Sequence, residues 1–487
     1  MNLTLIVFVV VYLLGTLAIG VWAGRRIKGT ADFAVAGRSL PLIMVVTTTF
    51  ATWFGAETVM GIPAKFVQGG LGAIVEDPFG AGMCLVLVGL FFAAKLYQKN
   101  LLTIGDFYRQ RFGRGVEIFC SLAIILSYLG WVAAQITALG LVFSVLTNGA
   151  MSPAAGMIVG TLAVLVYVVI GGFMAVAWTD FIQMIVLVLG LSAIAWFAAD
   201  LAGGAGVVLD LATQKELWNF LPPPKLHDML FFFAAAITMM IGSIPQQDVF
   251  QRVMSAKDAR TAQRGAVIGG VSYILFAFVP MFIVLAAVTV MGGRAMELAE
   301  NDYQRLLPAF IMGHMPLAMQ ILFFGALLSA IKSTSSATLL APSTSFVENI
   351  LKQIRPGMND QQQLRAMRIT IVVFSVFVLL YAIAMQGTPI YELVSAAYQV
   401  TLVGAFVPLV MGLYWQRATT QGAIFSIFAG VFTWMLFFPQ VSTWGEAFPG
   451  QLAGLLAAFA GMLFGSLAPQ WLADRHDHVS HHLRPHP

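Results

Sequence analysis

The sequence has few charged residues. Asp, Glu, Lys and Arg make up 10% of its 487 residues, whereas hydrophobic residues make up 59% and the mean hydropathy is +0.86. Soluble domains carry about 25% charged residues. The shortage of charge therefore excludes an ordinary soluble protein, and the net charge of +4 needs an explanation other than nucleic-acid binding.

Cysteine and long polar stretches are also scarce. The two cysteines, Cys84 and Cys120, lie in separate apolar segments and match neither a metal-binding spacing nor a disulfide framework. No polar stretch approaches the ~50 residues that a small soluble domain needs. We therefore expect no appended enzymatic module and no organic cofactor.

Long apolar runs are abundant instead. Each has 18 or more residues and can cross the ~30 Å hydrocarbon core of a bilayer as a helix. The first run is followed by Arg25, Arg26 and Lys28, the reverse of a secretory signal, so it is predicted to be an uncleaved span. The sequence predicts thirteen spans, at about 3–23, 43–65, 71–94, 116–148, 153–171, 175–200, 229–250, 265–291, 316–348, 369–386, 391–415, 421–439 and 450–472.

The basic residues predict the orientation. With the N-terminus outside, 20 of the 26 Lys and Arg fall in loops and the tail on the cytoplasmic side, and five fall outside. This positive-inside bias predicts a multi-pass protein of the plasma membrane, taken to be a bacterial inner membrane. The His-rich end at 473–487 is then a cytoplasmic tail rather than a metal site.

One basic residue belongs to neither side. Lys332 lies in SAIKSTSSATLLAP (329–342), within an apolar span. A charge at the centre of a bilayer is costly and usually marks a functional site. Ser333 and Thr334 follow it and offer two hydroxyls beside the carbonyl of Ala330. Such oxygens suit a monovalent cation, although Ser and Thr also join helices to one another.

Two further polar stretches interrupt predicted spans. TTTFATWFGAETVMGIP (47–63) combines glycines, a proline and Glu57, which weakens a helix and frees carbonyls for a cation or solute. Close packing of small residues is the alternative. GGFMAVAWTDFIQMIVLVLG (171–190) places Asp180 and Gln183 three residues apart, on one helical face. Asp180 there is a candidate for a cation site or proton relay, or else a local capping group.

These stretches, together with AGRSL (36–40) and GLYWQRATTQGA (412–423), resemble the sodium/solute symporter family in order and spacing. That family includes sodium-coupled sugar, proline and sialic-acid carriers. The resemblance implies an all-α leucine-transporter fold with two inverted five-helix repeats. The implied organisation is an extra N-terminal helix at 1–28, repeats at 43–200 and 229–415, two C-terminal helices at 421–472 and the tail at 473–487.

The resemblance also implies ion sites. Carried over by position, the sodium site uses carbonyls of Ala51, Phe54 and Ala330 and hydroxyls of Ser333 and Thr334. Sodium is the only metal expected. A second ion or proton site, present in some members, would use Asp180, Ser333 and Ser336, beside Lys332. A hydroxyl expected at the next position is replaced by Ala337.

The solute cavity of such a fold lies between several core helices. Trp53 stands where the proline carriers have an aspartate, which argues against proline itself. Glu76 and Asp77, near the outer end of a span, are expected to be solvated. The expected solute is small and organic, such as a carboxylate or an amino acid. The resemblance nominates Trp53, Glu57, Tyr128, Gln135, Gln246, Gln247, Tyr398 and Gln399 as its contacts.

The expected function is sodium-driven import by alternating access, without enzymatic activity or an obligatory protein partner. Lys332 leaves three alternatives. It pairs with Asp180 or Glu57, it stands in for an ion, or it exchanges a proton so that the carrier is proton-coupled or sodium-independent. A transporter-like sensor would keep the same fold. A Ser–Lys hydrolase built on Lys332 and Ser336 lacks an oxyanion motif.

Overall fold

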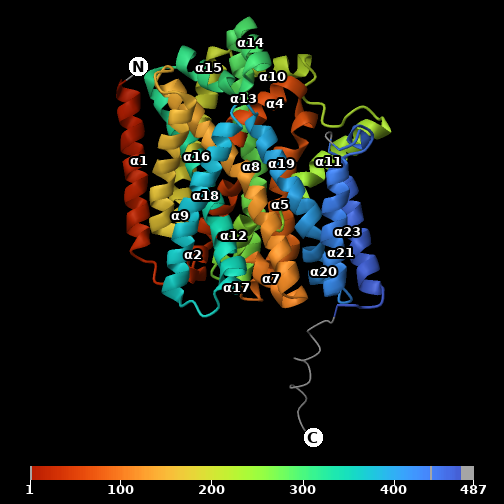
Figure 1. Ribbon diagram of the computed structural model, residues 1–487. Helices are drawn as coiled ribbons and strands as arrows, with labels where there is room; N and C mark the ends of the chain where they lie inside the picture. The colour runs from red at the N-terminus through yellow and green to blue at the C-terminus, as the bar shows by residue number, and fades with distance from the viewer. Residues whose placement is uncertain (1–2, 439–440, 473–487) are drawn as a thin grey trace.

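The computed structural model describes residues 3–438 and 441–472, and these residues form helices and no strands (Figure 1). The predicted tail at 473–487 lies outside the described residues. One isolated bridge joins Leu40 and Ala256. The α-helices are α1 Leu3–Gly24, α2 Thr30–Val35, α3 Leu42–Trp53, α4 Ile62–Gly69, α5 Ala81–Leu87, α6 Ala93–Tyr97, α7 Ile104–Phe112, α8 Arg114–Leu146, α9 Pro153–Leu201, α10 Ala205–Gln214, α11 Leu226–Gly242, α12 Gln247–Ser255, α13 Ala259–Met291, α14 Gly293–Asn301, α15 Leu306–His314, α16 Leu317–Ser345, α17 Lys352–Ile354, α18 Asp360–Ala384, α19 Ile390–Thr401, α20 Val407–Tyr414, α21 Thr420–Leu436, α22 Trp444–Ala447 and α23 Gly450–Leu467.

Wider π-helical turns connect several of these helices into longer rods. Such turns occur mostly as single turns within α-helices and are frequent at functional sites. They are η2 Glu57–Gly61, η4 Val75–Gly80, η5 Val88–Phe92, η7 Phe346–Leu351 and η8 Leu402–Phe406. Short 3₁₀ turns lie at η1 Ala36–Arg38, η3 Leu71–Ile74 and η6 Tyr303–Arg305.

Nine helices in the described residues are long and apolar enough to cross a membrane. Two bent pairs raise this number to as many as eleven. Leu42–Trp53 meets Glu57–Gly69 at 57°, and Leu226–Gly242 meets Gln247–Ser255 at 45°. The chain is therefore a multi-pass membrane protein. The predicted run 421–439 corresponds to α21, which at 17 residues falls just below the length of the others.

The predicted spans 153–171 and 175–200 are the two halves of α9. They meet at Gly172, whose φ of 49° and ψ of −152° are not helical. A straight helix of 49 residues would measure ~73 Å, far more than the membrane thickness. Only glycine fits this bend, because a Cβ there would lie 2.6 Å from the Phe33 carbonyl oxygen.

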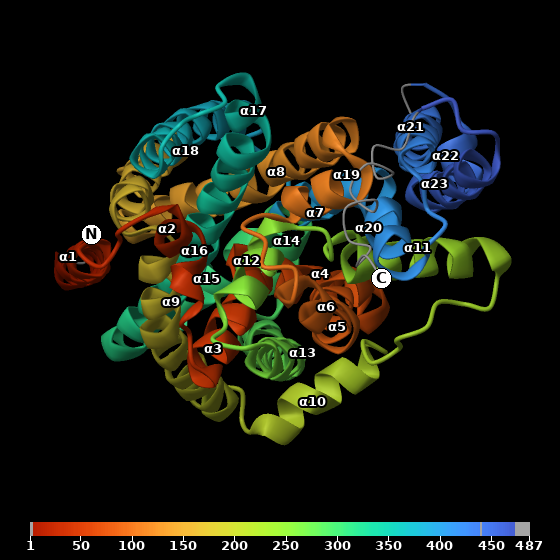
Figure 2. The ribbon, with the colours of Figure 1, turned by 90° about the horizontal axis from the view of Figure 1, so that it is seen from below.

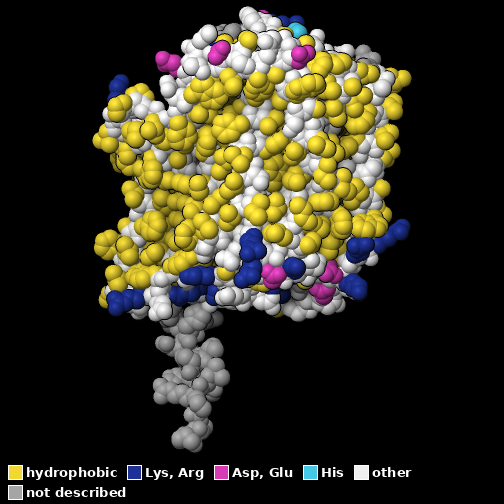
Figure 3. All heavy atoms as spheres, turned by 180° about the vertical axis from the view of Figure 1, so that it is seen from behind, with side chains coloured by type: hydrophobic (Ala, Val, Ile, Leu, Met, Phe, Trp, Pro, Cys, Tyr) yellow, Lys and Arg dark blue, Asp and Glu magenta, His cyan; other side chains and the backbone are white. Residues whose placement is uncertain are grey.

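Apolar and basic side chains are distributed over the surface as expected for a protein in a bilayer. Large apolar side chains are exposed on the flank of the molecule, for example Trp196 at 79% and Phe464 at 75%, and Figure 3 shows a broad hydrophobic belt there. Lys and Arg side chains gather below this belt, at the end that carries α2, α7 and α17 (Figures 1 and 3). We call this the basic end.

Helix α16 forms the centre of the molecule. Every side chain from Phe323 to Ser345 is buried, and α16 packs on α9, α8, α3 and α12. Viewed along the helices, α1 lies at one edge, against α9 and α16, and the pair α21 and α23 lies at the opposite edge (Figure 2). The polar motifs of the sequence are thereby brought into the interior.

Candidate functional site

The break between α3 and η2 is surrounded by oxygen atoms. Phe54, with φ −79° and ψ 76°, ends α3. A Cβ at Gly55 would lie 2.7 Å from Glu57 Oε2, 2.9 Å from Thr334 Oγ1 and 3.0 Å from Gln135 Oε1. Side chains of three elements thus converge on Gly55, where a Cβ would displace at least one of them. This explains the glycine in the motif at 47–63.

The residues predicted for the sodium site lie on two packed helices. Ala51 and Phe54 stand at the broken end of α3, and Ala330, Ser333 and Thr334 lie on α16, which contacts α3. The five side chains are buried. Thr334 Oγ1 has no hydrogen-bond partner among the described residues. The donor set, carbonyl and hydroxyl oxygens, matches the preference of a hard cation.

Asp180 of α9 joins the same two helices. Its carboxylate accepts hydrogen bonds from the hydroxyl of Ser333 and, at 2.6 Å, from Thr48 Oγ1 of α3. Ser336 Oγ instead donates to the carbonyl oxygen of Ser333 at 2.7 Å. Asp180 is therefore deep in the interior, 0% exposed, and does not serve as a cap at a helix end.

A buried arginine extends this network. Arg252 of α12 is 1% exposed. Its Nε donates to the carbonyl oxygen of Thr48 at 2.7 Å, and its guanidinium lies 3.6 Å from the Asp248 carboxylate. Asp248 in turn accepts a hydrogen bond from the hydroxyl of Tyr128 on α8. Asp248 and Arg252 are four residues apart in DVFQR, a spacing that favours an ion pair on a helix, but this pair was not among the residues predicted from the sequence.

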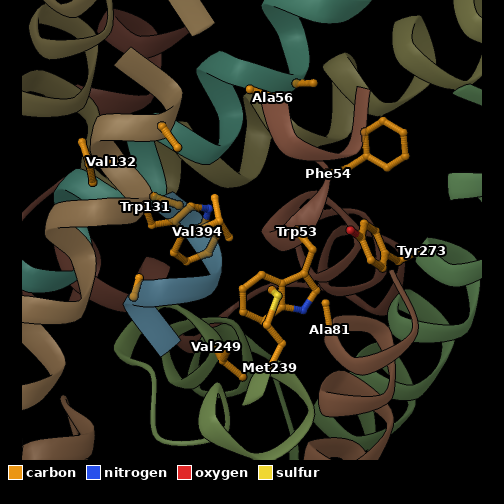
Figure 4. Close-up of a cluster of buried hydrophobic side chains, with 14 of the residues drawn as sticks. Trp53, Phe54, Ala56, Ala81, Trp131, Val132, Met239, Val249, Tyr273 and Val394 are labelled. Atoms are coloured by element: carbon orange, nitrogen blue, oxygen red, sulfur yellow. The ribbon is translucent and has the colours of Figure 1, made fainter. Parts of the chain in front are cut away.

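Aromatic rings line the interior next to the break. Trp53 stacks on Trp131 with ring centres 5.0 Å apart, and Tyr398 meets both rings edge-on at 5.5 Å. Tyr128 also stacks on Trp131, with ring centres 6.0 Å apart. Figure 4 shows Trp53 and Trp131 side by side, with Val394 nearby. We call Trp53, Trp131, Tyr128 and Tyr398 the aromatic cage, although in this structure the four buried rings pack against one another. Trp131 was not predicted, because no motif marks it.

Glu57 is the acidic group at the cage. Its Oε2 accepts a hydrogen bond from Gln135 Nε2 at 2.6 Å, and its Oε1 lies 3.4 Å from the donating Trp131 Nε1. Gln135 Oε1 also accepts from the backbone N–H of Ala56 at 3.0 Å. The carboxylate is 1% exposed and forms no ion pair with a described residue. The carboxyl group of Glu57 thus lies at the indole edge of Trp131.

Two more carboxylates lie nearby, and the expectation that they are solvated was wrong. Asp77 is 2% exposed and Glu76 6% exposed, because the turn η4 folds inward against α11. Asp77 accepts a hydrogen bond from Tyr273, and Glu76 accepts from Ser395 Oγ at 2.8 and 2.9 Å. Asp77 lies close to both Glu57 and Glu76. Three carboxyl groups are therefore buried in one region.

Three of the glutamines predicted for the solute cavity do not lie together. Gln246 Nε2 donates to Ser127 Oγ at 2.8 Å, at the break between α11 and α12. Gln247 Oε1 instead accepts from the backbone N–H of Ile104 at 2.9 Å, and Gln399 Oε1 accepts from Trp434 Nε1 of α21 at 3.0 Å. Trp53, Glu57, Tyr128, Gln135 and Tyr398 come together at the cage, whereas Gln247 and Gln399 are engaged elsewhere.

Lys332 has partners that the sequence did not predict. Its ammonium donates to the hydroxyl of Thr16 on α1 and lies 4.3 Å from the ring centre of Tyr167 on α9. It is 2% exposed. It forms no salt bridge with Asp180 or Glu57. The side chain therefore turns away from the cage and toward the N-terminal helix.

Comparison with known proteins identifies the family. The family model described as the sodium:solute symporter family matches residues 33–430. The chain belongs to the sodium:solute symporter family. Its members are transporters and not enzymes. The symporter is 25% identical to the high-affinity choline transporter 1 of Caenorhabditis elegans, over 96% of this chain and 87% of that protein.

Two further comparisons concern a bacterial relative and a solved structure. It is 26% identical to the high-affinity proline transporter of Bacillus subtilis, over 94% of this chain and 98% of that protein. Its structure matches the substrate-bound outward-open state of a sodium-coupled sialic acid symporter with a TM-score of 0.81 at 20% identity, covering 95% of this chain and 97% of the other. The all-helical architecture is therefore of the leucine-transporter type expected from the resemblance.

Proposed function

We propose that the symporter imports a small organic cation with a substituted ammonium group, driven by the sodium gradient. The aromatic cage beside Glu57 is the observation that supports this solute class. Ring faces attract cations, most strongly when water is excluded, and cages of this kind recognise quaternary ammonium groups. The relatives include choline transporters, and choline, the solute in their names, carries a quaternary ammonium group.

The charges around the cage favour a cation over the carboxylate solute expected from the sequence. Glu57, Glu76 and Asp77 are buried on this side, whereas Arg252 is engaged by Asp248 and Lys332 faces α1. A solute carboxylate would thus lie among buried carboxyl groups, with Lys65, which contacts the ring of Tyr391 at 4.4 Å, as a basic residue in the same region. The ammonium group of an amino acid would fit the same cage.

Sodium is the proposed coupling ion, held by the carbonyls of Ala51, Phe54 and Ala330 and the hydroxyls of Ser333 and Thr334. An ion between α3 and α16 would fix the end of α3. Trp53 and Glu57 flank that end, so the same ion would order two groups of the cage. This shared segment is a physical route by which sodium raises solute affinity, and by linkage the solute raises sodium affinity equally.

Lys332 has two alternative roles in this proposal. We propose that its ammonium is a fixed positive charge on α16, in the residue next to Ser333, which makes a second sodium unnecessary. Its only described partners are Thr16 and Tyr167, which leaves the charge without a carboxylate. In the alternative form the lysine exchanges a proton during the cycle, and transport is proton-coupled or sodium-independent.

We also propose thirteen crossings, with the N-terminus outside and the C-terminus cytoplasmic. The bend at Gly172 divides α9 into two crossings, and α21 adds one to the eleven counted above. The basic end would face the cytoplasm, in a bacterial inner membrane. The repeats at 43–200 and 229–415 gain support from the two broken helices, since each begins a repeat.

Uptake into proteoliposomes tests the proposed function. Labelled choline should enter in response to an inward sodium gradient and not in response to an equal potassium gradient. Trp131→Leu should weaken choline binding about 30-fold, as expected for ~2 kcal/mol of cation–π attraction. Trp196→Leu, on the lipid-facing surface, should leave uptake unchanged. Sodium-driven uptake of a neutral or anionic solute, with no binding of choline or tetramethylammonium, would refute the cationic solute.

A further inference from the structure

A groove of about 540 Å³ lies on the flank of the molecule, between α8, α16 and α18. Its α18 side consists of one helical stripe that runs from Ala366 to Phe377. Ile369, Val373 and Phe377 in this stripe are 57%, 63% and 56% exposed. Its floor is Pro342 and Ser343 of α16. We call it the α16–α18 groove. It is separate from the cage and has no part in the function proposed above.

The length of the groove matches half a membrane. The α18 stripe covers eleven steps along a helix, which at 1.5 Å per residue is ~17 Å. The hydrocarbon core of a bilayer is ~30 Å thick. The groove therefore extends through about one leaflet, as a single acyl chain does.

The groove is apolar along its length but charged at one end. Arg355, which follows α17, is the one charged residue among those that line it. The side chain is exposed and forms no ion pair with a described residue. Lys352, one turn earlier, is by contrast neutralised by Glu348 at 2.7 Å.

Further positive charge surrounds Arg355. Arg114 of α8 donates to the carbonyl oxygen of Gln353 at 2.9 Å, which holds a second guanidinium at α17. Arg365 is exposed at the start of the α18 stripe. These three arginines belong to the basic end of the molecule, where α17, α18 and α8 lie together (Figure 2). A phosphate group at this end of the groove would meet Arg355, with Arg114 and Arg365 on neighbouring elements, while the carboxylate of Glu117 is engaged by Gln353 at 3.0 Å.

We propose that the α16–α18 groove binds a phospholipid with an anionic headgroup, from the leaflet at the basic end. One acyl chain lies along α18 on the floor formed by Pro342 and Ser343, and the headgroup phosphate contacts Arg355. The match of length to one leaflet and the charge at the headgroup level both support this occupant. A soluble peptide or a second copy of the chain would not require either feature.

Lipid titration of the full-length, delipidated protein tests the proposal. Native mass spectrometry counts bound lipids, and thermal unfolding reports their effect. Phosphatidylglycerol should bind more tightly than phosphatidylcholine with the same acyl chains. Arg355→Gln should remove about fivefold of this preference, the contribution of one basic residue near an anionic lipid surface, and Arg355→Lys should keep most of it. Arg26→Gln, a basic residue elsewhere at the same end, should have no effect.

A groove-filling variant tests the position of the acyl chain. Val373→Trp should weaken both lipids about equally and leave sodium-dependent stabilisation unchanged. Glycerol 3-phosphate, which has the charge but no chain, should not bind. Equal affinity of the wild type for both lipids would overturn the headgroup assignment. Lipid binding unaffected by Val373→Trp, or a dimer in the mass spectrum that buries the groove, would overturn the site itself.

Discussion

At the scale of single residues, the site is a set of buried polar groups, each with a distinct environment. Glu57 has neutral donors on both oxygens, Asp180 has two hydroxyls, and Lys332 has one hydroxyl and one ring. Buried charges are normally paired because an unpaired charge loses its hydration. Glu57 and Lys332 are therefore the residues at which a ligand charge or a substitution should have the largest effect.

Replacing Glu57 by glutamine should separate solute binding from sodium binding. The amide keeps the shape but removes the charge, and unit charges about 5 Å apart attract by ~3 kcal/mol at an effective dielectric of 20. We expect choline affinity to fall about 100-fold in a competition binding assay, while stabilisation by sodium persists. Glu446→Gln, at an exposed site, is the matched control. Unchanged affinity in Glu57→Gln would place the solute elsewhere.

Replacing Lys332 by methionine should raise sodium affinity. The ammonium repels a sodium ion at Ser333 and Thr334, by ~1.7 kcal/mol if the charges are on the order of 10 Å apart at an effective dielectric of 20, or more than tenfold in affinity. Thermal unfolding in sodium chloride against potassium chloride measures this. Lys332→Arg retains the charge and should behave as the wild type. If sodium stabilises both variants and the wild type alike, Lys332 is electrically remote from the ion.

At the scale of elements, the path of the chain is determined by the positions at which its helices are interrupted. The α3–η2 break and the α11–α12 break expose carbonyls and amides inside the membrane region, which lipid tolerates only where the backbone lines a cavity or is buried in protein. Glycine permits close approach at the first break. At Gly172 it permits the positive φ that reverses α9. These positions fix the path of the chain before any ligand binds.

Gly172→Ala should therefore destabilise the fold. The new Cβ would lie 2.6 Å from the Phe33 carbonyl oxygen, in a backbone conformation with φ 49°. A strain of ~1–3 kcal/mol is typical of such a conformation, and the steric clash adds to it. The measurement is the thermal midpoint in detergent. Gly206→Ala, with nothing within 4 Å and helical geometry, should be neutral or slightly stabilising. A native midpoint in Gly172→Ala would mean that α9 does not bend there.

At the scale of the whole molecule, one chain of buried contacts joins the proposed ion site to the aromatic cage. It runs from Ser333 through Asp180, Thr48 and Arg252 to Asp248 and Tyr128, and Tyr128 stacks on Trp131. The contacts cross α16, α9, α3, α12 and α8. Removing one member of a buried ion pair is far more costly than removing both, because it leaves a charge uncompensated.

A double-mutant cycle on Arg252 and Asp248 tests this. Arg252→Met alone should lower the free energy of unfolding by about 3–5 kcal/mol, since Asp248 loses its cation. The double variant Arg252→Met with Asp248→Leu should recover part of that loss. Chemical denaturation measures each corner of the cycle. Additive effects, with no recovery, would mean that the pair is not coupled.

Much of the fold and part of the candidate site could be predicted from the sequence. The residues that could not be predicted depend on contacts between distant segments. Ala51, Ser333 and Thr334 could be nominated for the sodium site because family motifs are local in sequence, and this assignment stays a prediction. Trp131 was missed because its partner Trp53 lies on another helix and no motif surrounds it. Glu76 and Asp77 were misjudged because the inward fold of η4 depends on α11. The partner of Lys332, Thr16, lies 316 residues away, and composition contains no information about that pairing.

The attachment of α1 has a consequence for how the protein is made. Tyr12 and Thr16 meet Ser329 and Lys332 across more than 300 residues. At ~5–20 residues per second, the ribosome takes on the order of 15–60 s to add the segment between them. During that interval α1 is already in the membrane without its partners on α16. The first helix to be inserted can thus pack on α9 at an early stage, but its polar contacts to Ser329 and Lys332 form only after α16 has been made.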